Sequence, residues 1–376
     1  MNLGLYIHLP YCSHHCVYCD FNVYSLKQKR ELDQYLSVIL KEIDFYAQKF
    51  HDRITDTIYL GGGTPSLFSV DQIERLLSAV YSRFQMSALT EITIEANPAS
   101  VLLSKLKGFR LLGINRLSLG IQTFQSHHLR TLERDHSVNQ AVKSFESARQ
   151  AGFETINVDL IFGIPNQTLG DLNEDLDQLF LLEPEHASIY HLTVDKFNRL
   201  SPNLPSDELT AQMYTFIIER MADAGYKHYE VSAFAKEGFL CRHHLKYWRL
   251  EDYLGLGAGA YSYFRDGDHS WGISFKNVDS WEGYSSRVEK EGEAQEDFEK
   301  VTLEKAKADY LITHLRLLEG ISYSDYEGRF GENIMISYGY KINSLMEEQL
   351  LDSSQGMLKL TKKGLFYLNQ VLLKLL

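Results

Sequence analysis

The first two thirds of the chain repeats one pattern of hydrophobic and polar positions. A short apolar run is followed by a polar or glycine-rich turn, and then by a longer stretch in which apolar residues recur every three or four positions. Short apolar runs predict buried strands, and a period of about 3.6 residues predicts amphipathic helices. The predicted strands are Leu3–Leu9, Thr57–Leu60, Glu91–Glu95, Asn115–Leu119, Thr155–Leu160 and His186–Leu192. The predicted helices between them are Lys27–Phe50, Val70–Arg83, Ser100–Leu112, Asn139–Ala151 and Gly170–Phe180.

This alternation of strand and helix predicts an α/β protein with a parallel sheet covered by helices. Six such units are too few for the closed barrel, which needs eight. We therefore expect an open, partial (β/α)6 barrel, and a doubly wound sheet is the competing architecture. In both folds, ligands bind at the carboxyl ends of the strands.

The last third of the chain has a less regular pattern. Pro202 and Pro205 mark a loop, a helix is predicted near Glu208–Ala224, and Tyr226–Val231 is predicted as a strand. From about residue 300 a separate, mostly helical domain begins, and its last part alternates helix, short strand and helix in a winged-helix-like order. The predicted division is 1–235 for the partial barrel, 236–298 for a connecting segment and 299–376 for the C-terminal helical domain.

Composition and charge narrow the class of protein. The chain of 376 residues is 44% hydrophobic and 23% charged, which is usual for a globular protein in water. Its net charge of −12 argues against a nucleic acid partner. The first residues, Met1–Leu5, lack the features of a secretory signal, and no run approaches the ~20 apolar residues of a membrane span. We therefore expect a cytoplasmic protein.

Three of the four cysteines lie close together, at Cys12, Cys16 and Cys19, directly after the first predicted strand. Cys241 is far from them in the sequence. Iron–sulfur clusters are held by cysteine thiolates, usually four of them. Three thiolates leave one iron of a cubane cluster open to another ligand. The loop therefore predicts a cluster that does chemistry on a molecule bound at the open iron.

Two other interpretations of this loop remain open. Positions 12, 16 and 19 would fall on one face of a helix, where buried cysteine behaves as a small hydrophobic residue. A zinc ion is the second alternative, with His14 or His15 completing the ligand set. Pro10, Ser13 and the two histidines make a poor amphipathic helix, which favours the cluster. Disulfides do not explain three clustered cysteines, because one would stay unpaired.

Polar or glycine-rich segments follow the other predicted strands as well. The second strand ends at Gly61-Gly62-Gly63-Thr64-Pro65, the third at Glu95, the fourth at Gly120-Ile121-Gln122-Thr123 and the fifth near Asp159. Because parallel strands end at one rim, we expect these groups to share one site. The glycines are not a P-loop, since the Gly-Lys-Ser/Thr ending is missing.

Each of these groups suits part of one small ligand. Backbone groups of the glycine run could bind an amino group or a carboxylate, Glu95 and Asp159 suit ribose hydroxyls, and Arg134 could clamp a carboxylate. Taken alone, the glycines would be a plain turn and Arg134 a surface residue. Beside an open iron, the set predicts a site for S-adenosylmethionine (SAM). Reductive cleavage of SAM there would give a 5′-deoxyadenosyl radical, chemistry that belongs to the cofactors.

In combination these motifs resemble those of a known family. The cysteine spacing, Gly-Gly-Gly-Thr-Pro, Glu-Ala-Asn-Pro, Gly-Ile-Gln-Thr-Phe and Gly-Ile-Pro-Asn-Gln-Thr are similar to motifs of the radical SAM family of oxygen-independent coproporphyrinogen III oxidases, over roughly residues 4–265. The resemblance implies that Cys12, Cys16 and Cys19 bind a [4Fe-4S] cluster. It also implies that SAM contacts Tyr6, Tyr18, Gly62, Gly63, Thr64, Glu95, Gln122, Arg134 and Asp159.

Two departures favour the heme-chaperone branch of this family over the oxidases. The oxidases carry a further cysteine two residues after the third, where this chain has Phe21, and a longer segment before the cluster. The chaperones carry a His-Asn-x-x-Tyr-Trp heme-binding motif, which resembles His243-His244-Leu245-Lys246-Tyr247-Trp248. The resemblance therefore implies heme binding by His243, His244, Tyr247 and Trp248. Because His244 stands where the family has asparagine, the sequence leaves open which histidine binds the iron.

The resemblance thus implies a heme chaperone that binds a [4Fe-4S] cluster, SAM and heme, and that transfers heme to an acceptor protein. It also implies contact with membrane hemoproteins and a homodimer. The alternative is an oxygen-independent coproporphyrinogen III oxidase, a radical SAM enzyme of heme biosynthesis. A third interpretation is a zinc-stabilised α/β protein.

Overall fold

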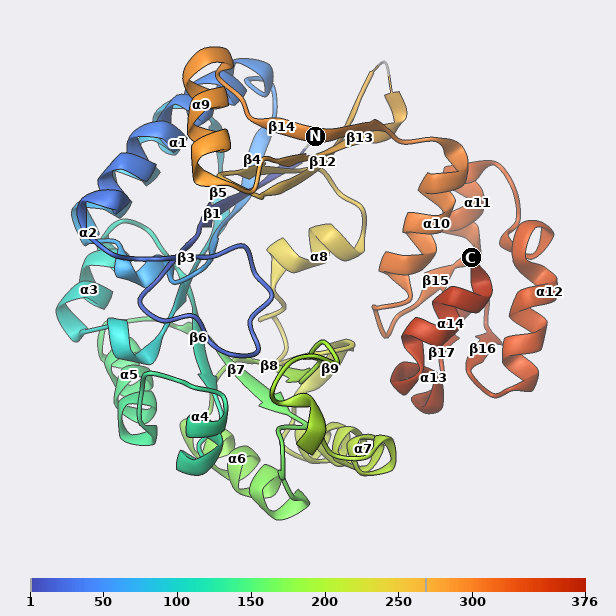
Figure 1. Ribbon diagram of the computed structural model, residues 1–376. Helices are drawn as coiled ribbons and strands as arrows, with labels where there is room; N and C mark the ends of the chain where they lie inside the picture. The colour runs from blue at the N-terminus through green and yellow to red at the C-terminus, as the bar shows by residue number, and fades with distance from the viewer. Residues whose placement is uncertain (1, 268) are drawn as a thin grey trace.

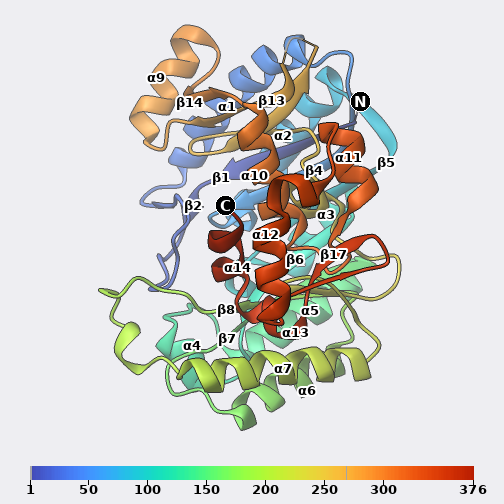
Figure 2. The ribbon, with the colours of Figure 1, turned by 90° about the vertical axis from the view of Figure 1, so that its right-hand side faces the viewer.

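A computed structural model describes residues 2–267 and 269–376. Its main feature is a curved sheet of twelve strands, in the order β14-β13-β12-β11-β1-β4-β5-β6-β7-β8-β10-β9. Helices cover the outer face of the curve, and the loop that follows β1 crosses the interior (Figure 1). A smaller domain formed by the end of the chain stands in front of the open side of the sheet (Figure 2).

Six parallel strands form the centre of this sheet and follow one another in chain order. They are β1 (Asn2–Leu9), β4 (Ile54–Gly62), β5 (Gln85–Ala96), β6 (Arg116–Gln122), β7 (Thr155–Phe162) and β8 (His186–His191). The helices outside them are α1 (Arg30–Lys49), α2 (Val70–Arg83), α3 (Leu103–Leu111), α5 (Val138–Gln150), α6 (Leu169–Leu182) and α7 (Asp207–Asp223). The partial (β/α)6 barrel is confirmed, because these helices all cover one face of the sheet, whereas a doubly wound sheet has helices on both faces.

The alternation of side chains along β1 shows how the sheet separates its two faces. The odd-numbered residues from Leu3 to Leu9 are fully buried beneath the outer helices. The residues between them, Gly4, Tyr6 and His8, point to the opposite face, because successive side chains of a strand alternate. That face is the barrel interior, where a ligand could reach them.

Local signals set where several outer helices begin. α2, α5 and α6 each start with a capping box, in which a serine or threonine and the residue three positions later exchange hydrogen bonds. The pairs are Ser69 with Gln72, Ser137 with Gln140, and Thr168 with Asp171. Such a cap satisfies backbone N–H groups that a helix start otherwise leaves free.

The segment 236–298, predicted from the sequence as a connection, extends the main sheet. Its elements are α8 (Arg242–Trp248), β11 (Tyr253–Leu256), β12 (Tyr261–Asp266), β13 (His269–Asn277), α9 (Trp281–Glu291) and β14 (Gln295–Lys300). β11 pairs in parallel with β1, and β12 to β14 continue the sheet in antiparallel order. At the other edge lie β9 (Lys227–Glu230) and β10 (Ala233–Ala235). α8 lies inside the curve, between the two edges of the sheet (Figure 1).

The C-terminal domain is mostly helical and has its own buried core. Its elements are α10 (Leu303–His314), β15 (Ile321–Ser322), α11 (Tyr323–Phe330), α12 (Ile334–Glu347), β16 (Leu351–Ser354), β17 (Met357–Leu360), α13 (Lys362–Phe366) and α14 (Leu368–Leu375). The three strands form a small antiparallel sheet in the order β15-β17-β16, which gives the predicted winged-helix-like arrangement. Among the residues that the structure describes, no helix is long and apolar enough to cross a membrane.

Candidate functional site

β1 leads into the cysteine loop at the carboxyl rim of the sheet. β2 (Tyr11–Cys12) pairs in parallel with β3 (Tyr24–Ser25), so the two ends of the loop lie side by side. The Tyr24 N–H donates to Pro10 O over 2.7 Å at this point. Residues 13–23 contain no helix, so the interpretation of the three cysteines as one face of a helix is wrong.

The three thiols lie in a half-buried setting beside one half-buried cation, Arg134. Arg134 Nη1 donates to Cys16 Sγ over 3.2 Å, and Cys12 Sγ lies 3.4 Å from Thr64 Oγ1. Burial raises the pKa of Cys12 to about 11, and burial also raises the pKa of Cys19. These two thiols are therefore protonated at neutral pH, and a metal must displace their protons to bind thiolate. The three sulfur atoms could hold an iron–sulfur cluster or a zinc ion.

Arg134 connects the cysteine loop to the end of β6. Its Nη2 donates to Gly120 O over 2.8 Å, and its Nη1 lies 3.4 Å from the Tyr18 hydroxyl. Its Nε is buried and has no hydrogen-bond partner among the described residues. A Cβ atom on Gly120 would lie 3.0 Å from Gln122 Nε2 and 3.6 Å from Arg134 Nη2, so both side chains gather over this glycine. This corner is rich in donors and suits a carboxylate ligand.

Gln122 has a left-handed backbone, with φ of 72°. This conformation is uncommon for residues other than glycine, and such residues cluster at ligand sites. Gln122 is half-buried at the carboxyl end of β6. The side-chain amide of Gln122 therefore lies at the rim, on a backbone that the surrounding structure holds in this conformation.

The glycine run at the end of β4 fastens the cysteine loop. The N–H of Gly63 donates to Leu9 O over 3.0 Å, and the N–H of Thr64 donates to Tyr11 O over 2.8 Å. A Cβ atom on Gly63 would lie 2.7 Å from backbone atoms of Pro10 and Tyr11, so the close approach requires glycine. These N–H groups, predicted from the sequence to be available for ligand binding, are therefore used within the protein.

Two carboxyl groups face the interior, Glu95 near the end of β5 and Asp159 in the middle of β7. Glu95 accepts from the Tyr59 hydroxyl over 2.9 Å and from the Gly62 N–H over 3.1 Å. Asp159 accepts from Ser118 over 2.9 Å. Burial, together with the charge of Asp159, raises the pKa of Glu95 to about 7, and burial also raises the pKa of Asp159. Since each carboxyl oxygen can accept a second hydrogen bond, both groups could bind ribose hydroxyls.

Tyr6 lies on the interior face of β1. Its hydroxyl is 2.9 Å from His8 Nδ1, and His8 Nε2 is 2.8 Å from Asn22 O in the cysteine loop. The Tyr6 ring lies 6.2 Å from the Tyr59 ring and 6.5 Å from the His243 ring, measured between centroids. Tyr6 thus links the loop to an aromatic layer below the rim.

His243 is fully buried, and its backbone N–H and both ring nitrogens have partners. Its N–H donates to Glu91 Oε1 over 3.0 Å. Its ring nitrogens lie 2.8 Å from Thr57 Oγ1 and 2.7 Å from the Tyr247 hydroxyl. His243 therefore anchors α8 to β4 and β5, and neither ring nitrogen is free to bind a metal.

His244 differs from its neighbour. Its half-buried ring lies 5.0 Å from the Tyr59 ring and is stacked 6.1 Å from the Tyr247 ring, and it makes no hydrogen bond with any described residue. Burial lowers the pKa of His244, and the carboxylates of Glu230 and Glu95 oppose this effect. The ring is therefore neutral at pH 7 and close to the Glu95 carboxyl.

Trp248 packs with Leu245 in a small cluster that does not include His243, His244 or Tyr247. It packs with Tyr229 and Leu317, in a small core that includes residues of the C-terminal domain. The Arg316 guanidinium lies 5.1 Å above its ring. The structure thus brings the rim residues and His244 toward one interior, but it does not bring Trp248 there.

Two polar residues that hold the cysteine loop are absent from the predicted site. Asp135 accepts from Ser13 over 3.1 Å and from Asn97 over 2.9 Å, and Asn198 donates to Val17 O over 2.7 Å. Burial raises the pKa of Asp135, but the hydrogen bonds from Asn97 and Ser13 outweigh it and the pKa is lowered. The position of Asp135 directly after Arg134 is a sequence signal that could have identified it.

Comparison with known proteins identifies the family. Residues 6–179 match the Radical SAM superfamily, and residues 295–367 match the HemN C-terminal domain. The heme chaperone HemW of Bacillus subtilis is 34% identical over 374 residues, which cover 97% of each chain. The heme chaperone HemW of Haemophilus influenzae is 33% identical, over 98% of this chain and 97% of that relative.

A solved structure of another radical SAM protein has the same fold. The coproporphyrinogen III oxidase HemN of Escherichia coli, a radical SAM enzyme, aligns with a TM-score of 0.86 and 25% identity, over 99% of this chain and 89% of that chain. The resemblance found in the sequence is therefore confirmed, and a radical SAM domain implies a [4Fe-4S] cluster and SAM. The chain belongs to the HemW family of heme chaperones, within the radical SAM superfamily.

Proposed function

We propose that this protein is a heme chaperone that carries a [4Fe-4S] cluster and SAM at the rim of its barrel, binds heme beside α8, and transfers the heme to an acceptor protein. The full-length similarity to relatives named heme chaperone HemW supports the chaperone function. The single observation that carries the assignment of heme to this site is the unpartnered ring of His244 inside the barrel.

Cys12, Cys16 and Cys19 would hold the cluster as thiolates, and the fourth iron would bind SAM. The bound pair supplies radical chemistry through reductive cleavage of SAM. The task of this chain is to lose the thiol protons, to hold the loop still, and to exclude water. The hydrogen bonds from the backbone N–H groups of Gly63 and Thr64 hold the loop in place.

The remaining rim residues would orient SAM. Arg134 offers the buried Nε that lacks a partner among the described residues, which suits the carboxylate of SAM. Glu95 and Asp159 would accept from the ribose hydroxyls. The other residues that would line the SAM site are Tyr6, Tyr18, Gly62, Gly63, Thr64 and Gln122.

His244 is the histidine that we assign to heme iron. Iron binds imidazole through a ring nitrogen that makes no other bond. Both ring nitrogens of His243 lie within hydrogen-bond distance of Thr57 or Tyr247, whereas His244 has none of these contacts. Tyr59 and Tyr247 would offer flat faces to the porphyrin. His243 would then support the site as the anchor of α8.

Oxidative decarboxylation of coproporphyrinogen III is a second candidate function. The TM-score of 0.86 with the HemN oxidase favours it. Phe21 opposes it, since this side chain is 70% exposed at the position where the oxidase pattern has a further cysteine. The chaperone function therefore fits more features of the sequence than the oxidase function does.

We further place the protein in the cytoplasm and expect a homodimer that delivers heme to acceptors, membrane hemoproteins among them. We assign residues 299–376 to the C-terminal domain. The preceding residues would then be the barrel together with its sheet extension.

An anaerobic preparation distinguishes the two functions. The protein is reconstituted with iron and sulfide, titrated with heme, and then incubated with SAM, a reductant and coproporphyrinogen III. We expect about four irons and about one heme per chain, transfer of heme to an apo-hemoprotein, and no protoporphyrinogen. Robust formation of protoporphyrinogen without stable heme binding would overturn the proposal.

A further inference from the structure

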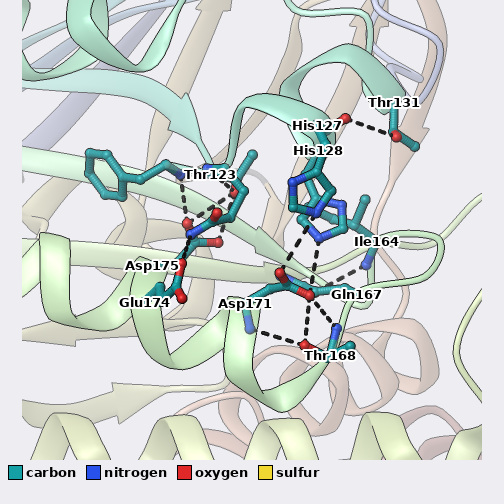
Figure 3. Close-up of polar contacts among 12 residues, drawn as sticks. Thr123, His127, His128, Thr131, Ile164, Gln167, Thr168, Asp171, Glu174 and Asp175 are labelled. Carbon is teal, nitrogen blue, oxygen red and sulfur yellow. Dashed lines mark hydrogen bonds and ion pairs between the residues drawn. The ribbon is translucent and has the colours of Figure 1, made fainter.

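A second cluster of potential metal ligands lies on the outer side of the barrel. α4 (Ser126–Thr131) follows β6 and carries His127 and His128, and Asp171 lies in the first turn of α6. Figure 3 shows both imidazole rings pointing toward the Asp171 carboxylate. His127 Nε2 lies 3.7 Å from Asp171 Oδ1, and His128 Nε2 lies 3.6 Å from Asp171 Oδ2. All three ligand atoms lie within 4.8 Å of one another.

The His128 ring is buried, and its contact with Asp171, at 3.6 Å, is longer than a hydrogen bond. Its side chain is 1% exposed, and neither Nδ1 nor Nε2 has a hydrogen bond to any described residue. Buried polar groups in folded proteins almost always have a hydrogen-bond partner, and a bound ion is one reason for an exception.

The Asp171 carboxylate is held in a fixed orientation. Its Oδ2 accepts from the Thr168 N–H over 2.8 Å and from the Thr168 hydroxyl over 2.7 Å, as part of the capping box of α6. Oδ1 accepts no hydrogen bond within the described part of the chain. Hydrogen bonds that orient a ligating carboxylate are a regular feature of metal sites.

The spacing of the donors suits a small divalent cation. Bond lengths of about 2.0–2.1 Å to zinc place neighbouring donors of a tetrahedral site about 3.3–3.4 Å apart. The two nitrogen–oxygen distances, 3.7 Å from His127 to Oδ1 and 3.6 Å from His128 to Oδ2, exceed this by only a few tenths of an ångström, and the two histidines face different oxygens of the same carboxylate. Two imidazoles and one carboxylate are a ligand set that zinc and similar transition metals prefer.

We propose that His127, His128 and Asp171 form a binding site for a divalent transition-metal cation of the zinc type. Water would complete the coordination, because His127 is half-exposed and leaves one side of the cluster open. The site is separate from the cysteine loop and uses no residue of the rim. Its existence does not depend on heme or SAM binding.

The location of this site gives it a structural consequence. α4 lies in the chain between Gln122 and Arg134, which we assign to SAM. One turn further along α6, Asp175 accepts from the Thr123 hydroxyl over 2.8 Å and from the Phe124 N–H over 2.6 Å (Figure 3). A metal at the histidine cluster would be a second attachment of this segment to α6. This consequence rests on the proposed function, whereas the metal site does not.

The test is a zinc titration of the cluster-loaded protein, in which iron already occupies the three cysteines. We compare the wild-type protein with His127→Ala and Asp171→Asn, since asparagine can still accept from Thr168. His51→Ala is the matched control, because His51 is an exposed histidine in the turn after α1 whose Nδ1 lies 3.0 Å from Gln48 O. A competing chelator measures affinity, and X-ray absorption at the zinc edge identifies the ligand atoms.

We expect one zinc per chain with nitrogen and oxygen ligands in the wild-type protein and in His51→Ala. We expect at least about tenfold weaker binding in the two cluster variants, with heme binding unchanged in both. Unchanged zinc affinity in the cluster variants, sulfur among the ligands, or no zinc binding by the wild-type protein would overturn the proposal. Loss of heme binding by the wild-type protein would instead contradict the proposed function and leave the metal site standing.

Discussion

Nε2 of His243 lies 2.7 Å from the hydroxyl of Tyr247, one turn further along α8. Nδ1 of the same ring lies 2.8 Å from Thr57 Oγ1 on β4. The pair therefore joins α8 to the inner face of the sheet. The two adjacent histidines therefore have different roles. Both ring nitrogens of His243 are used in contacts within the protein, whereas the His244 ring is free to bind a ligand.

His243→Ala should lower the free energy of unfolding by about 2–4 kcal/mol, because it creates a cavity and leaves Thr57 and Tyr247 without partners. His244→Ala is the matched control, and we expect a change of about 1 kcal/mol or less, since that ring makes no hydrogen bond. Urea unfolding of the cluster-free protein measures both values. Equal losses in the two variants would contradict the assignment of His243 as the anchor.

Gly63→Ala should displace the cysteine loop. The added Cβ atom would lie 2.7 Å from the backbone of Pro10 and Tyr11, which cannot move aside as a side chain can. We expect a loss of about 1–3 kcal/mol in stability and reduced iron and sulfide uptake during reconstitution. Gly328→Ala is the control, because Gly328 lies in α11 with open space around it. Full iron uptake by Gly63→Ala would show that the loop does not need this close contact.

Arg134→Lys should weaken SAM binding while the iron content stays the same. Lysine keeps the charge but lacks Nε and the planar fork that suits a carboxylate. We expect SAM affinity to fall about tenfold, measured by calorimetry on the reconstituted protein. Arg130→Lys, on the exposed face of α4, provides the control. Equal SAM affinity in Arg134→Lys and the wild-type protein would remove Arg134 from the site.

The stability of the cluster-free protein should depend on pH through Glu95. The pKa of this carboxyl is raised to about 7 in the folded protein, mainly by burial, whereas an unfolded chain has a pKa of about 4.3. Its neutral form is favoured in the folded state, so its contribution is fully present below about pH 4 and is lost as the pH rises through 7.

Glu95→Gln removes this dependence. Between pH 5 and pH 7.5 the wild-type protein should lose about 1–3 kcal/mol of stability relative to Glu95→Gln. Other buried carboxyls, Asp175 among them, titrate in both proteins, so the difference isolates Glu95. Parallel stability curves for the two proteins would show that the Glu95 pKa is not raised.

The central barrel could be predicted from the sequence because its signals are local. Each β/α unit has a short apolar run, a turn and an amphipathic stretch, and the predicted strands lie within one or two residues of β1 and β7. The extension of the sheet could not be predicted in this way. β14 has the sequence QEDFEK and is largely exposed, so only its pairing with β13 makes it a strand.

The candidate site shows the same limit at the level of side chains. The order of strands predicts that Glu95, Gln122 and Asp159 share a rim, since parallel strands end together. Sequence cannot show that the N–H of Gly63 is already taken by Leu9, which depends on how closely β1 and β4 approach. The spacing of His243 and Tyr247, four residues apart on a helix, is a signal for the bond between them.

The most direct test of the heme site is a heme titration of His244→Asn and His243→Gln beside the wild-type protein. If His244 binds the iron, His244→Asn should weaken heme binding at least about tenfold and change the heme absorption spectrum. His243→Gln, which keeps polar atoms near Thr57 and Tyr247, should bind heme within about threefold of the wild-type affinity in its folded fraction. Wild-type heme binding by His244→Asn, together with loss of binding in His243→Gln, would contradict the account and assign the iron to His243.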